Sequence, residues 1–156
     1  MIFVITGTHY QGFERLIKKM DEIAAKTNEN VIIQVGYAKY KPETAEYFDF
    51  VPYAKIVELC REARAVICTD GSGSMITAIK CGKIPIVVPR KQEYGEAAYN
   101  TKSSLAREFA KENVITLLED TDKLEVELKK DRYYVTVPPR KDNLASKLKE
   151  YIENIG

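Results

Sequence analysis

Residues 65–90 read AVICTDGSGSMITAIKCGKIPIVVPR, in which an apolar run ends at a turn of small residues. A short helical stretch follows the turn and stops at Gly82, and a second apolar run extends from Ile84 to Val88. This order predicts a strand, a turn, a helix and a strand, which make one βαβ unit. The turn falls at the carboxyl end of its strand, where open parallel sheets bind ligands. Backbone N–H groups and a helix N-terminus make such a turn suitable for phosphate.

The same alternation continues through the rest of the chain. Apolar runs predict strands, and apolar residues at helical spacing predict helices. The strands are expected at 2–6, 31–35, 47–51, 65–69, 84–88 and 114–118, and further helices at 13–23, 56–63, 98–112 and 122–130. This order predicts an α/β fold, a Rossmann-like parallel sheet flanked by helices. We expect residues 1–156 to form a single domain, with a C-terminal helix over 140–156 that follows Pro138-Pro139.

The composition excludes several classes of protein. The 156 residues carry 24 Lys and Arg against 23 Asp and Glu, so the net charge is +1 and nucleic acid is not an expected partner. No apolar run is long enough to cross a bilayer and no leader is legible, which predicts a cytoplasmic protein. Cys60, Cys68 and Cys81 fall in apolar elements and are expected to be buried thiols. With one His and no C-x-x-C pattern, we expect neither a metal site nor another cofactor.

Two strand ends carry small or hydroxyl-bearing residues, namely Gly7-Thr8-His9 and Gly71-Ser72-Gly73-Ser74. If the first and fourth strands are neighbours, these loops face each other across a crevice. Their N–H groups and hydroxyls could then hold a diphosphate from two sides. Neither loop is a Walker A sequence or a complete G-x-G-x-x-G, which disfavours a nucleoside triphosphate hydrolase. The alternative is that both are tight strand-to-helix turns without a ligand.

Polar residues near these loops are further candidates. His9, exposed after a strand, could donate a hydrogen bond to phosphate or act as a catalytic base. Arg90 follows the fifth strand on the same edge of the sheet, and Lys91, Gln92, Glu93 and Glu96 come after it. This segment could meet the hydroxyls of a sugar or a phosphate, or it could be a solvated charged loop. No nucleophile–base pair is legible, and G-x-S-x-G is absent.

The combination of these stretches resembles the C-terminal, donor-binding half of glycosyltransferase family 28, which has the GT-B fold. The likeness is to the single-domain members, such as the small catalytic subunit of the dolichol-linked N-acetylglucosaminyltransferase. It covers residues 1–120 in order and spacing. The matching stretches are FVITGTH at 3–9, FERLI at 13–17, GSGS at 71–74, GKIPIVVPR at 82–90 and YGE at 94–96.

The resemblance implies a donor site and a partner. Gly7 and Thr8, with the segment Gly71 to Ser74, would contact the diphosphate of a UDP-sugar. Phe50 and Val51 would make backbone contacts with uracil, and Glu96 and Asn100 would reach the donor sugar. The resemblance also implies inverting transfer without a chelated metal, to a lipid-linked type of acceptor on a membrane-anchored partner subunit. Homo-oligomer formation is left open.

The chain departs from the family pattern at four positions. Thr69 stands where a His or Arg is usual, and Asp70 places a carboxylate near the expected diphosphate, which it would repel. Thr77 stands where the family has a Glu that holds the ribose hydroxyls, and Thr101 begins the segment that usually carries a His-Gln pair. Two interpretations follow. The chain is a donor-binding subunit of a glycosyltransferase, or it is a non-catalytic relative that binds a nucleotide or a protein, which these departures favour.

Overall fold

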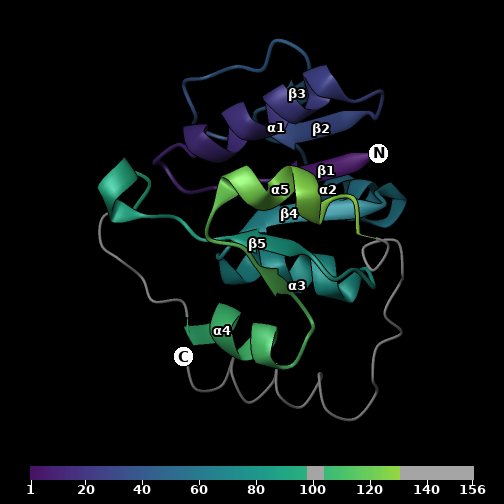
Figure 1. The fold of residues 1–156 in the computed structure, drawn as a ribbon, viewed down its shortest axis with the longest axis vertical. Coiled ribbons are helices and arrows are strands. Elements are labelled where there is room, and N and C mark those ends of the chain that lie inside the picture. The colour runs from purple at the N-terminus through teal and green to yellow at the C-terminus, as the bar shows by residue number, and fades with distance from the viewer. Residues whose placement is uncertain (98–103, 131–156) are drawn as a thin grey trace.

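The computed structural model describes residues 1–97 and 104–130, which form a parallel β-sheet with helices on both faces (Figure 1). The strands run in the order β3-β2-β1-β4-β5-β6, and every neighbouring pair is parallel. Their bounds are β1 (Ile2–Ile5), β2 (Val31–Gln34), β3 (Glu46–Phe48), β4 (Ala65–Thr69), β5 (Ile86–Val88) and β6 (Thr116–Leu117). The predicted α/β class and parallel sheet are confirmed.

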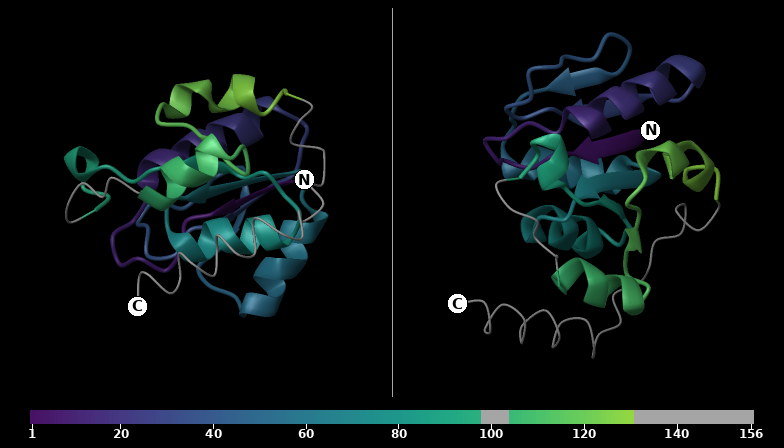
Figure 2. Two further views of the ribbon diagram at one scale, coloured as in Figure 1. Left: turned by 90° about the horizontal axis from the view of Figure 1, so that it is seen from below. Right: turned by 60° about the vertical axis from the view of Figure 1, so that its left-hand side comes forward.

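Alternate residues of the central strands build two separate cores, one on each face of the sheet. Helices cover both faces (Figure 2). Ile2 and Val4 of β1 pack in the core with α1 (Glu14–Lys26) and α5 (Leu124–Glu127). The opposite core is formed by Phe3 and Ile5 with α2 (Tyr53–Glu62), α3 (Ser72–Lys80) and α4 (Ser104–Lys111). Across 1–97 and 104–130, none of the helices combines the length and apolarity needed to cross a lipid bilayer.

Several elements differ from the predicted bounds. β3 ends at Phe48 rather than at residue 51, because its partner β2 ends at Gln34, which pairs with Phe48. The helix expected at 122–130 is a 3-10 turn, η2 (Thr121–Lys123), followed by the single-turn helix α5. Cys60 and Cys68 are buried as expected, whereas Cys81 is only partly buried. The first part of the helix expected at 98–112, and the helix expected at 140–156, lie outside the described residues.

A buried carboxylate of α1 holds the loop that leads to β3. Asp21 Oδ1 accepts the N–H groups of Thr44 and Ala45 at 2.9 Å each. Asp21 Oδ2 accepts the N–H of Glu43 at 2.9 Å and the hydroxyl of Tyr40 at 2.7 Å. Burial alone would raise the pKa of Asp21, but these four hydrogen bonds outweigh it and lower the pKa below the ordinary 3.8. The loop is therefore anchored to the body of the sheet.

Candidate functional site

The loops after β1 and β4 lie side by side at the carboxyl edge of the sheet. β1 and β4 are direct neighbours, with Ile5 paired to Cys68. Gly7 has a φ of +80°, and a Cβ at this position would lie 3.8 Å from Ser74 Oγ and 3.9 Å from Thr69 Oγ1. The backbone of the first loop thus reaches the start of the second. The first and fourth strands are therefore neighbours, which is the condition that the sequence analysis set for these two loops to face each other.

The N-terminus of α3 lies beside the loop after β1. Gly71 precedes the helix in an extended conformation, and no side chain among the described residues caps it. The Gly71 N–H is bonded to Thr69 Oγ1 at 3.3 Å. The next N–H groups of a helix have no partner in the helix itself, so they remain open to an acceptor. Gly73 is exposed, and a Cβ there would meet no atom within 4 Å, which leaves room for a ligand to approach the backbone.

The loops after β2 and β3 extend the same edge. A Cβ at Gly36 would lie 3.1 Å from Gly7 O and 3.8 Å from the ring of Phe50. Phe50 keeps 43% of its surface exposed and meets Tyr37 edge-on, with ring centroids 5.0 Å apart. Val51 is partly buried and packs against the core on the α2 side. The structure therefore brings Phe50 close to Gly7, although the two residues are 43 positions apart in the sequence. From the sequence, only the resemblance predicted that Phe50 belongs to this site.

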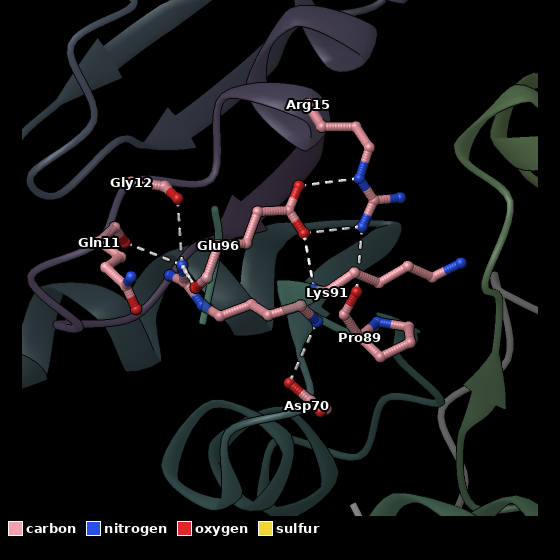
Figure 3. Close-up of polar contacts among 8 residues, drawn as sticks. Gln11, Gly12, Arg15, Asp70, Pro89, Lys91 and Glu96 are labelled. Atoms are coloured by element: carbon pink, nitrogen blue, oxygen red, sulfur yellow. Dashed lines mark hydrogen bonds and ion pairs between the residues drawn. The ribbon is translucent and has the colours of Figure 1, made fainter. Parts of the chain in front are cut away.

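Arg90 links the loop after β1 to the loop after β5, and its partners Gln11, Gly12 and Glu96 are labelled in Figure 3. Its guanidinium donates to backbone carbonyls, with Nη2 bonded to Thr6 O at 2.8 Å. Nη1 is bonded to Gln11 O at 2.8 Å, to Gly12 O at 3.2 Å and to Glu96 O at 3.1 Å. These bonds hold Thr6 at one end, and Gln11 and Gly12 at the other end, of the segment that carries Gly7, Thr8 and His9. Arg90 therefore fixes the position of the loop after β1.

Glu96 is the second member of this network. Its side chain is buried, and its two carboxylate oxygens are bonded to Arg15, from Nε at 2.8 Å and from Nη2 at 3.0 Å. It also accepts the Lys91 N–H at 2.9 Å. The sequence suggests that Arg90 and Glu96 contact a ligand, but in this structure their polar groups are used to join loops. Asn100 and Thr101 lie outside the described residues.

The model of the glycosyltransferase family 28 C-terminal domain matches residues 1–154. The chain belongs to this family. The family predicted from the quoted stretches is therefore confirmed, while the single-domain type remains a prediction. The comparison with curated proteins gave no match.

Solved structures of glycosyltransferases share the fold. The glycotransferase of kitacinnamycin aligns with a TM-score of 0.63 at 17% identity, over 85% of this chain and 36% of its own. CalG4, the calicheamicin glycosyltransferase, gives a TM-score of 0.59 at 15% identity, over 99% and 44%. SnogD from Streptomyces nogalater gives 0.53 at 16% identity, over 96% and 43%. The sheet thus corresponds to one half of a GT-B glycosyltransferase, and the chain spans 36% to 44% of the length of these proteins.

Two departures from the family 28 pattern lie at the end of β4. Thr69 is buried and receives the Gly71 N–H, so it shapes the turn. Asp70 Oδ1 is 3.5 Å from the Arg90 N–H, whereas its Oδ2 is buried without a hydrogen-bond partner among the described residues. Burial raises the pKa of Asp70, and the Arg90 N–H and guanidinium only partly offset this effect. Asp70 is therefore an incompletely satisfied carboxyl group directly before the loop.

The third departure, Thr77, is buried, and its hydroxyl makes two hydrogen-bond contacts. Its hydroxyl donates to Gly73 O at 2.8 Å and lies 3.2 Å from the hydroxyl of Tyr53. Tyr53 is the first residue of α2 and keeps 63% of its surface exposed. Nothing in the motifs quoted above singles out Tyr53. The available signal was Pro52, which favours a helix start and would place Tyr53 at its first turn.

His9 is exposed, and its ring stacks on Tyr10 with centroids 4.7 Å apart. Its Nδ1 accepts the Gln11 N–H at 3.1 Å. In the neutral imidazole the proton then lies on Nε2, which makes this nitrogen a donor toward solvent. The geometry favours hydrogen-bond donation to a ligand over proton abstraction by Nε2.

Proposed function

We propose that this chain is the donor-binding half of a glycosyltransferase and holds a UDP-sugar between Gly7-Thr8-His9 and Gly71-Ser72-Gly73-Ser74. The observation that carries the proposal is the close approach of Gly7 to the N-terminus of α3, which no side chain of the described residues caps. Two short glycine-bearing loops on adjacent parallel strands leave backbone N–H groups for a diphosphate, and the helix dipole favours its charge. The match to family 28 supports the same site.

The order of the loops along the carboxyl edge of the sheet suggests where the uracil and the sugar of the donor would lie. The uracil would lie against the backbone at Phe50 and Val51, beside Gly36 and Gly7. The diphosphate would contact the two loops, and the sugar would extend beyond them. The backbone N–H groups of the two loops would stabilise the charge that develops on the UDP leaving group. In this proposal Arg90 and Glu96 act indirectly, because they hold the first loop in position.

The transfer would proceed with inversion. The acceptor oxygen forms a bond to the anomeric carbon while the bond from that carbon to the diphosphate oxygen breaks. UDP leaves, and the proton of the acceptor hydroxyl passes to a base. We assign the base to the acceptor-binding half, with His9 as the candidate in this chain. The resemblance to single-domain members favours a separate source for that half, and we propose that a membrane-anchored partner subunit supplies it for a lipid-linked acceptor.

Calorimetric titration with UDP and UDP-N-acetylglucosamine tests the donor site. Gly73→Leu fills the open space above the α3 N-terminus, so it should reduce affinity for both ligands at least tenfold while leaving the fold intact. Lys80→Leu, in the last turn of the same helix, is the matched control and should bind as the parent does. Equal binding by Gly73→Leu and the parent would show that the diphosphate lies elsewhere. Failure of the parent to bind either ligand would overturn the proposal.

A non-catalytic relative is the second candidate. The observation in its favour is Asp70, a carboxyl group with a buried, unpartnered oxygen beside the loop that would receive a diphosphate. A chain of this kind would bind a nucleotide or a partner protein through the same fold without transferring a sugar. The titration separates the protein-binding form from the donor-binding half, because only a nucleotide-binding chain shows saturable binding of UDP.

A further inference from the structure

Tyr53, Thr77 and Gly73 form a hydrogen-bond chain with a defined direction. Gly73 O is a carbonyl oxygen and can only accept, so the 2.8 Å bond to it uses the single proton of the Thr77 hydroxyl. Thr77 Oγ1 must then be the acceptor in its 3.2 Å contact with Tyr53 Oη. The Tyr53 proton is therefore directed into the protein, and the remaining lone pairs of Oη face outward. Tyr53 is an acceptor at this surface rather than a donor.

The position of this acceptor matters as much as its direction. Thr77 is 6% exposed, so the inner part of the chain is fixed, whereas Tyr53 is 63% exposed and accessible. The chain begins at Gly73, in the loop proposed to bind the diphosphate. Tyr53 also follows Val51 by two residues, in the segment proposed to meet the base. An acceptor between a diphosphate site and a base site faces the part of a nucleotide that joins them, which is the pentose.

We propose that Tyr53 Oη accepts a hydrogen bond from a ribose hydroxyl of the donor, and that it makes the site selective for ribonucleotides. The inference rests on the proposed function and deepens it. A pentose hydroxyl is the donor that an outward lone pair requires, and a deoxypentose lacks one of these donors. Thr77 is a positioning residue in this arrangement, because it sets the direction of the Tyr53 proton without contacting the ligand.

The test compares UDP, 2′-deoxy-UDP and 3′-deoxy-UDP by calorimetry on the parent and on Tyr53→Phe. The parent should bind UDP about 3- to 10-fold more tightly than at least one of the deoxy analogues, as expected for one net hydrogen bond. Tyr53→Phe should lower UDP affinity by the same factor and remove the discrimination. Tyr47→Phe is the matched control, since Tyr47 is an exposed tyrosine on β3. It should leave both quantities unchanged.

Variants of Thr77 test the direction of the chain. Thr77→Ser keeps the hydroxyl and should retain discrimination, whereas Thr77→Val removes the acceptor for the Tyr53 proton and should weaken discrimination. Thermal melting of each variant establishes that it is folded. UDP binding that is unaffected by Tyr53→Phe would overturn this inference and leave the donor site standing. If the parent binds none of the three nucleotides, the inference and the proposed function both fall.

Discussion

Two parts of the same sheet edge use their polar groups in opposite ways. The loops after β1 and β4 are built from glycine and small hydroxyl residues, and the helix that begins there has no side-chain cap among the described residues. The loop after β5 carries Arg90 and Glu96, whose polar groups are bonded to carbonyls, to Arg15 and to the Lys91 N–H. The charged side chains at this edge hold the loops, and the small residues leave backbone groups for a ligand. The charged groups of the β5 loop therefore already have partners within the protein.

Arg90 gives the strongest test of this difference. Arg90→Met removes four hydrogen bonds to backbone carbonyls and the cation–π contact with the Phe13 ring. At about 1 kcal/mol for each unmet acceptor, the free energy of unfolding should fall by about 4 kcal/mol. Urea unfolding measures the loss. Arg61→Met, at an exposed position in the last turn of α2, is the control and should change it by less than about 0.5 kcal/mol.

If Arg90→Met does not fold, the free energy of unfolding can be measured on Arg90→Lys instead. Lysine retains the charge but lacks the planar fork that reaches several carbonyls at once. Its stability should lie between those of the parent and Arg90→Met. A parent-like value for either variant would mean that the β5 loop does not hold the β1 loop.

Glu96 decides between a structural and a ligand-binding role. Glu96→Gln breaks the ion pair with Arg15, in which the Glu96 side chain is 3% exposed and the Arg15 side chain 18% exposed. The loss of stability should be about 2 kcal/mol, less than for a fully buried pair because Arg15 keeps some solvent contact. If the side chain only joins loops, the ratio of the UDP and UDP-N-acetylglucosamine affinities should not change. A selective loss of the sugar-bearing ligand would restore the role that the resemblance implies.

The strands and their loops are predictable from the sequence because their signals are local. Runs such as Val66 to Cys68 are apolar throughout, and glycine marks the turns that follow them. The close approach of the loops after β1 and β4 follows once these two strands are neighbours. The roles of Arg90 and Glu96 are not predictable in this way, because their partners at Thr6 and Arg15 are 84 and 81 residues distant. Burial of a charged side chain depends on such partners and leaves no trace in its neighbours along the chain.

The length of β3 and the contacts of Tyr53 also depend on partners that are distant in the sequence, so they are not predictable from local patterns. β3 ends where its partner β2 ends, so its length is set by pairing rather than by its own residues. The role of Tyr53 depends on the side-by-side placement of α2 and α3, which brings its hydroxyl to Thr77. Hydrophobic periodicity places both helices on the sheet but does not specify which residues meet between them.

Asp70 lies between the two parts of the edge and has a smaller effect. Its pKa is raised by burial, so the ionised carboxylate destabilises the fold as the pH rises above the ordinary 3.8, and protonation removes the penalty. Asp70→Asn should therefore be more stable than the parent at neutral pH and equal to it below 3.8. It should also bind UDP about fivefold more tightly, because two charges 4 Å apart in water repel by about 1 kcal/mol. Weaker UDP binding by this variant would place Asp70 among the ligand contacts.

The smallest expected effect concerns His9, the one ring nitrogen donor at the open part of the edge within the described residues. Its Nδ1 accepts a hydrogen bond from the Gln11 N–H, so the proton of the neutral ring lies on Nε2 and is available to a diphosphate. His9→Asn keeps a side-chain acceptor for that N–H, since an Asn side chain commonly bonds the backbone two residues on, and it removes the Nε2 donor. The fold should be unchanged, and UDP affinity should fall by about threefold, the lower range for one neutral hydrogen bond. Calorimetry at constant salt measures the change. Unchanged affinity would exclude donation to the diphosphate and leave only the role of base, which requires the acceptor-binding half to be present.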